Sequence, residues 1–95
     1  MNKEIIDEIL DEFDFEKVHK VMVALNWTWY GTEGIPTIGD LRRNARELLN
    51  TVVKNGEYCY GTGGFYAYME NGLLGLRFEV TNWEVEVEVE KGIGQ

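Results

Sequence analysis

The hydrophobic pattern of this chain changes its period once, near Asn55-Gly56, and that change limits the folds it can adopt. Before this point apolar residues recur at spacings of three and four, which is typical of amphipathic helices. After it apolar and polar residues alternate, which indicates half-buried strands. Helices followed by strands predict an α+β fold, and 95 residues are enough for a single domain spanning residues 1–95.

Two or three helices are expected before the change of period, over 3–13, about 15–26 and about 38–54. Asp14 is placed to cap the second helix, because a carboxylate accepts hydrogen bonds from free backbone N–H groups. Thr37 is a good cap for the third helix, with Asp40 three residues later near the positive end of the helix dipole. Gly56 can end that helix in the left-handed conformation.

Two or three antiparallel strands are expected after it. Asn71-Gly72 is the strongest short hairpin signal, and it joins a strand over 64–70 to a second one that begins near Leu74. The apolar parity then shifts across Thr81-Asn82. Either a bulge there keeps one long strand facing the core, or a turn starts a third strand, which we favour.

The helices should pack on one face of this small sheet and leave the other face to water or to a partner. The predicted outer face carries tyrosines on its first strand and glutamates on its last. These residues are Tyr66, Tyr68, Glu84, Glu86, Glu88 and Glu90.

The charge excludes several classes of protein. Seventeen acidic and nine basic residues give a net charge of −8, which argues against direct binding to nucleic acid or to anionic lipid. No apolar run approaches the roughly 20 residues of a membrane span, and the N-terminal segment is too acidic for a signal peptide. We therefore expect a cytoplasmic protein.

Signals for catalysis are weak. The chain has no serine, one cysteine (Cys59) and one histidine (His19), so nucleophile–base pairs and metal sites lack their usual residues. His19 falls at the edge of an apolar helix face, where a boundary residue is the simpler interpretation. We expect no enzyme activity, no cofactor and no metal.

Aromatic and basic residues offer better candidates for binding. Trp27 and Trp29 stand two apart before a glycine-containing loop, and they either close the end of the core or form a contact platform. Arg42 and Arg46 lie one turn apart at the edge of an apolar helix face. They are either ordinary solvated residues that pair with Glu47 and with acidic residues of the helix over 3–13, or they form a fork for a phosphate, a carboxylate or an acidic segment of a partner.

A glycine run precedes the first predicted strand and includes Thr62, Gly63 and Gly64. Such a run can present successive N–H groups to an anion, although no P-loop lysine follows it. The alternative is a turn, or a close backbone crossing under a tryptophan.

Several of these motifs together resemble a group of small uncharacterised proteins encoded by bacteriophages and prophages. They are Leu25-Asn26-Trp27-x-Trp29, a helix opened by Pro36-Thr37-Ile38, Thr62-Gly63-Gly64-Phe65, Leu74-x-Leu76-x-Phe78-x-Val80 and Trp83-Glu84. The resemblance covers most of residues 15–84 and carries no assigned chemistry. It implies an accessory role in the cytoplasm of a bacterial host.

The leading hypothesis is a small, non-catalytic, phage- or prophage-derived binding protein that engages a host protein or another phage protein, for instance as an inhibitor of host defence. One alternative is a protein that sequesters a small anion or nucleotide through the arginines and the glycine run. Another is an acidic mimic of nucleic acid, since alternate glutamates on a strand repeat about every 6.6–6.8 Å. A homodimer formed through the edge of the last strand is also expected.

Overall fold

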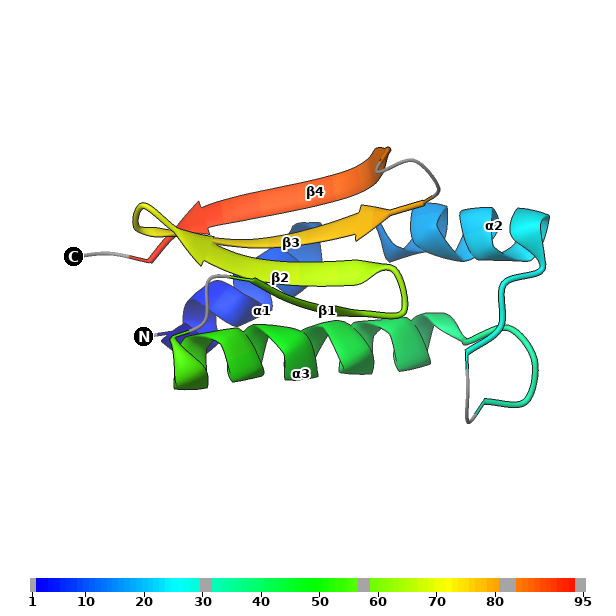
Figure 1. Cartoon of the computed structure of the whole chain (residues 1–95), viewed down its shortest axis with the longest axis horizontal. Helices are drawn as coiled ribbons and strands as arrows, with labels where there is room; N and C mark the ends of the chain where they lie inside the picture. Colours follow the sequence, from blue (N-terminus) through cyan, green and yellow to red (C-terminus); the bar gives the residue numbers. More distant parts are fainter. Residues whose placement is uncertain (1, 30–31, 57–58, 81–83, 94–95) are drawn as a thin grey trace.

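The computed structural model describes residues 2–29, 32–56, 59–80 and 84–93, and it has the predicted α+β architecture. Three helices are followed by an antiparallel sheet in the order β1-β2-β3-β4 (Figure 1). The helices are α1 (Asn2–Glu12), α2 (Phe15–Leu25) and α3 (Ile38–Asn55). The strands are β1 (Cys59–Thr62), β2 (Phe65–Glu70), β3 (Leu73–Glu79) and β4 (Val85–Gly92).

The helix ends are fixed by the residues that the sequence indicated. The Asp14 carboxylate accepts a hydrogen bond from the Lys17 amide at 3.0 Å and starts α2. Thr37 and Asp40 form a complete capping box, each side chain bonded to the other's backbone N–H at 3.1 Å. Gly56 ends α3 with φ +66°, in the left-handed region that glycine adopts at low cost.

The strands form a meander whose register places one apolar face toward the helices. Asn71 and Gly72 both have positive φ, so they make the tight turn that joins β2 to β3. The core face carries residues opposed across the sheet, such as Phe65 with Phe78 and Phe78 with Val87. β3 and β4 are separate antiparallel strands, while Thr81-Asn82 itself lies outside the described residues.

The strand β1 was not expected from the sequence. It includes Gly61 and Thr62, and it pairs antiparallel with β2. Thr62 belongs to the glycine run for which the sequence leaves an anion site or a turn open. The turn between β1 and β2 is made by Gly63 and Gly64 alone, both with positive φ. The sheet therefore has four strands, with β1 at one edge, instead of the three-stranded meander that the sequence favours.

The helices cover one face of this sheet. α3 packs mainly on β2 and β1, whereas α1 and α2 contact β4, and α1 and α2 both contact α3 (Figure 1). Buried residues of all three helices and of β2 and β3 form one cluster, which includes Ile9, Val18, Leu49, Phe65 and Phe78. Within the described residues, no helix is both long and apolar enough to cross a membrane.

The turn between β1 and β2 provides a test of this packing. A Cβ on Gly64 would lie 2.8 Å from Phe78 and 2.9 Å from Trp27, whereas one on Gly34 would meet nothing within 4 Å. Both glycines have φ near +90° (+92° and +86°), so alanine is strained at either position. We expect Gly34→Ala to cost about 1–2 kcal/mol and Gly64→Ala about 2–4 kcal/mol of unfolding free energy, measured by urea denaturation. Equal losses would show that the aromatic packing on this turn is not tight.

Candidate binding surface

The two tryptophans pack on the glycine turn and close one end of the core. Trp29 donates its indole N–H to the carbonyl of Gly63 at 3.1 Å, and its ring meets Phe65 edge-on at 6.1 Å. The Trp27 ring lies 5.5 Å from that of Phe78. Both side chains are half-buried against the core cluster. The structure therefore has a glycine turn that crosses closely under a tryptophan. Part of the surface of both indole rings is buried in this packing.

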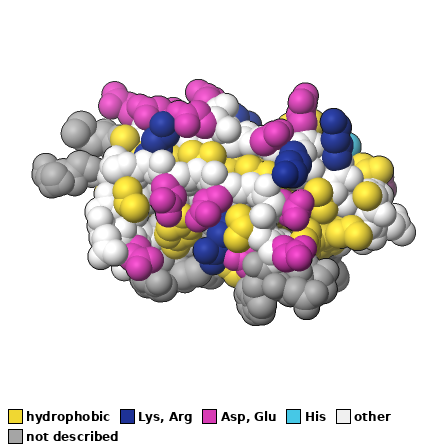
Figure 2. Space-filling model, turned by 90° about the horizontal axis from the view of Figure 1, so that it is seen from above, with side chains coloured by type: hydrophobic (Ala, Val, Ile, Leu, Met, Phe, Trp, Pro, Cys, Tyr) yellow, Lys and Arg dark blue, Asp and Glu magenta, His cyan; other side chains and the backbone are white. Residues whose placement is uncertain are grey.

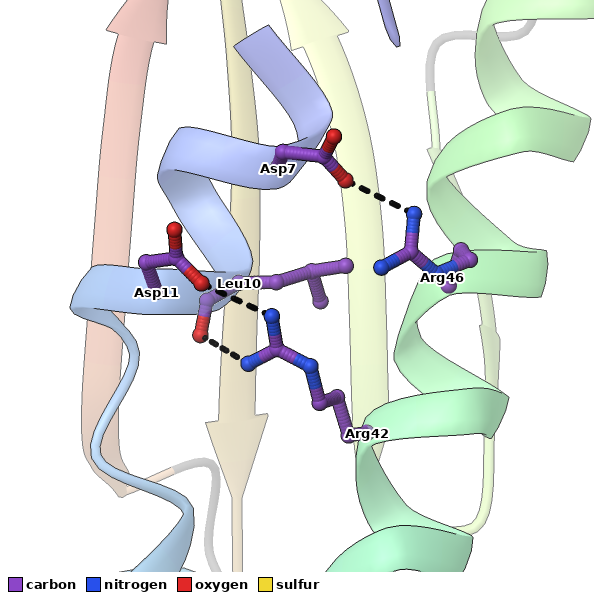
Figure 3. Close-up of polar contacts among 5 residues, drawn as sticks. All are labelled: Asp7, Leu10, Asp11, Arg42 and Arg46. Carbon is purple, nitrogen blue, oxygen red and sulfur yellow. Dashed lines mark hydrogen bonds and ion pairs between the residues drawn. The ribbon is translucent and has the colours of Figure 1, made fainter. Parts of the chain in front are cut away.

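Arg42 and Arg46 join α3 to α1 (Figure 3). Arg46 pairs with Asp7 at 2.7 Å, and Arg42 pairs with Asp11 at 2.7 Å while also donating to the Leu10 carbonyl at 3.0 Å. Leu10 lies in the last turn of α1, where backbone carbonyls have no partner within the helix, so Arg42 also caps that helix. An anion at these guanidinium groups would have to compete with two carboxylates already in place.

The predicted binding residues do not converge on one concavity. A shallow pocket of about 190 Å³ includes Trp29 and, from α3, Arg43 instead of Arg42 or Arg46. Asp40 also lines this pocket. Hydrogen bonds from the backbone and side chain of Thr37 hold the pKa of the Asp40 carboxyl below its ordinary value, and the nearby charge of Arg43 lowers this pKa as well. The amide nitrogen of Asn44 is buried beside this pocket without a hydrogen-bond partner.

Tyr66 and Tyr68 alternate with the core residues of β2, so they lie on the opposite face of the sheet.

On that outer face each tyrosine ring lies over a glycine of a neighbouring strand. A Cβ on Gly75 would lie 2.2 Å from the Tyr68 ring, and one on Gly61 would lie 2.3 Å from the Tyr66 ring. The Arg77 guanidinium stands within 5.5 Å of the Tyr68 ring centre and 5.9 Å of that of Tyr66. Tyr68 is only 7% exposed as a result, although no helix covers this face among the described residues.

By crossing β3 over Gly75, Tyr68 reaches the acidic row on β4. Its hydroxyl lies 2.5 Å from a carboxylate oxygen of Glu88 and also contacts Glu90. Burial, followed by these hydrogen bonds, raises the pKa of Tyr68 above its ordinary value. The two carboxylates therefore converge on one hydroxyl instead of standing evenly apart, which departs from the spacing that the mimicry hypothesis requires.

The charge of this face is unbalanced. Arg77 forms an ion pair with Glu79, which is 6% exposed and whose other carboxylate oxygen has no hydrogen-bond partner. Arg77 lies opposite Glu88 in the sheet register, but its ion pair is with Glu79. Among the described residues, the glutamates at 84, 86, 88 and 90 form no ion pair with a lysine or arginine. Figure 2 looks onto the side of the molecule on which β4 lies, and it shows acidic side chains there with lysine and arginine side chains among them.

No sequence pattern indicates the roles of Gly61, Gly75, Arg77 and Glu79. Each role depends on which residues stand opposite one another in the sheet, and alternation within one strand does not reveal that. Within the described residues, no group of three or more His, Cys, Asp or Glu side chains is placed to hold a metal ion.

The arginine contacts predict unequal effects on stability. Arg42→Ala should lower the unfolding free energy by about 1–2 kcal/mol, because it removes both an ion pair and a bond to a helix carbonyl. Arg46→Ala should cost about 0.2–1 kcal/mol, the range for a partly exposed ion pair. Urea denaturation in 0.05 M and 1 M NaCl checks both values, since high salt should reduce the Arg46 effect most. Two losses of equal size would remove the helix-capping role of Arg42.

No protein-family model, curated protein or solved structure among those compared with this chain matches it. The phage resemblance stays a prediction.

Proposed function

We propose that this chain is a non-catalytic accessory protein of phage or prophage origin that binds a basic region of a host protein. The outer face of the sheet is the proposed contact surface. The observation that carries the proposal concerns Glu88 and Glu90 on β4. Both accept a hydrogen bond from the Tyr68 hydroxyl, and neither forms an ion pair with a lysine or arginine among the described residues. Glutamates that form no ion pair within the described part of the chain are complementary to lysines and arginines of another molecule.

Two features of this face suit protein recognition. Glu88 and Glu90 are exposed, and Leu73 on the same face is 37% exposed, so charge and apolar area lie together. Tyr68 contributes little contact area itself, but its hydroxyl fixes the positions of both carboxylates. A surface fixed before binding loses less conformational entropy when a partner arrives. The net charge of −8 would in addition speed the encounter with a basic partner.

The proposal is tested by finding the partner and then changing charge on one face only. A photo-cross-linking amino acid at Leu73 captures what docks on the outer face in a bacterial lysate. The captured protein is then purified, and its affinity for the chain is measured by calorimetry. We expect Glu86→Gln, Glu88→Gln and Glu90→Gln together to weaken binding about tenfold or more, since each lost charge pair contributes a few tenths of a kcal/mol to about 1 kcal/mol.

The matched control changes three exposed glutamates elsewhere, Glu16, Glu33 and Glu47, to glutamine. It alters the net charge equally, and it should leave the affinity within about twofold. Equal weakening by both triple variants would mean that only overall charge matters, and it would contradict a specific site on the outer face.

A further inference from the structure

The backbone of β4 has one side that pairs with β3 and one that does not. The Ile93 amide donates to the Gly72 carbonyl at 2.9 Å, and directly opposed residues in an antiparallel pair alternate between bonded and non-bonded. The bonded pairs along β3 and β4 are therefore Leu74 with Lys91 and Leu76 with Val89. It follows that Glu88 and Glu90 direct their N–H and C=O groups away from β3.

These backbone groups lie at an open edge of the sheet. β4 is the last strand in the order β1-β2-β3-β4, and in the described part of the chain no strand pairs with its other side. Figure 1 shows β4 as the outermost element on that side, with α1 behind the sheet. An edge of this kind is a template for an added strand, because its donors and acceptors are already extended and aligned.

Acidic side chains flank the edge on both faces of the sheet. On the outer face stand Glu88 and Glu90, both exposed. On the helical face Glu12 of α1, 52% exposed, pairs with Lys91 at 2.6 Å and raises the pKa of that lysine. Glu8 of the same helix adds to the effect. Val87 and Val89 also point to the helical face, where they are partly buried against the core.

This distribution of charge disfavours a second copy of the chain at the edge. Two β4 strands related by a two-fold axis would place Glu88 and Glu90 opposite glutamates of the other copy, and like charges directly opposed across strands are destabilising. The homodimer expected from the sequence would carry that cost, whereas a basic strand would gain from the same charges.

We propose that the free edge of β4 accepts an extended, basic segment of the partner as an added antiparallel strand. The segment carries lysine or arginine at alternate positions, opposite Glu88 and Glu90, and apolar residues between them, beside Val87 and Val89. This inference rests on the proposed function and specifies the conformation and sequence pattern of the partner.

The register makes the proposal specific about backbone groups. Because Glu88 and Glu90 point their own N–H and C=O groups outward, residues opposite them must form bonded pairs. The lysine amides of the added strand therefore face β4, and the amides of the intervening residues face away. Methylating one set or the other separates hydrogen bonding from charge.

The experiment uses the full chain and three synthetic peptides with acetylated and amidated ends. The first alternates Lys and Val over seven residues, beginning and ending with Lys. The second carries N-methyl groups on the three internal alternate amides of valine, and the third on the same number of lysine amides. Binding is measured by calorimetry, and amide chemical shifts of Glu88 and Glu90 are followed by NMR.

We expect the unmodified and valine-methylated peptides to bind alike and to shift the Glu88 and Glu90 amides. The lysine-methylated peptide should bind at least tenfold more weakly. Equal affinity of all three would mean capture by charge alone, which overturns strand addition and leaves the proposed function standing. Absence of binding by the unmodified peptide also overturns it. The proposed function fails separately, in the comparison of the two triple-glutamine variants.

Discussion

The ring of Phe65 packs against aromatic rings from three other segments of the chain. It lies 5.9 Å from Phe13 and 6.2 Å from Phe15, at the junction of α1 and α2, and it also meets Trp29 and Phe78. Because Phe65 follows the Gly63-Gly64 turn directly, the position of that turn determines where the first residue of β2 enters the core. The packing of Trp27 and Trp29 on the turn is therefore a condition for the rest of the sheet. An offset or edge-on aromatic pair adds about 0.5–1.5 kcal/mol beyond the burial of its area, so this group of rings holds the two halves of the chain together.

Features encoded within a few residues could be predicted from the sequence. The Thr37 cap, the Asn71-Gly72 hairpin and the two hydrophobic periods each depend on local backbone chemistry, and each lies where the pattern indicates. β1 could not be predicted in the same way, because its glycines carry no alternating pattern. It forms by pairing with β2, where Gly61 stands opposite Tyr66 and gives room for that ring. A strand that is stabilised by its neighbour leaves little trace in its own residues.

The candidate site also contains features that local sequence predicts and features that depend on the register of the sheet. Pairing of Arg42 and Arg46 with the acidic first helix could be anticipated, since both arginines lie at the edge of an apolar helix face. The path of Tyr68 could not, because it depends on the register that places Tyr68 opposite Gly75 and Gly75 opposite Glu90. Alternation assigns Tyr68 to the outer face, but only the missing side chain at Gly75 lets its ring lie flat and reach β4. Tyr68, which the sequence predicts as a contact residue, thereby hydrogen-bonds Glu88 and Glu90 of β4.

The arrangement of Tyr68 also bears on how the outer face keeps its charge. A phenol has a single hydrogen to donate, so it satisfies one carboxylate fully while the second approaches the same oxygen. Two carboxylates that lie close together repel each other, which costs free energy. Arg77 forms its ion pair with Glu79 and not with these glutamates, so it does not offset that repulsion. Such a cost is tolerated in a fold whose stability comes from the opposite face of the sheet, where the aromatic cluster is buried. Lysines placed opposite Glu88 and Glu90 by an added strand would supply further donors and offset the repulsion. The same glutamates that disfavour pairing between two copies of the chain would then favour a basic strand. One set of charges would thus both exclude a second copy and attract a basic partner.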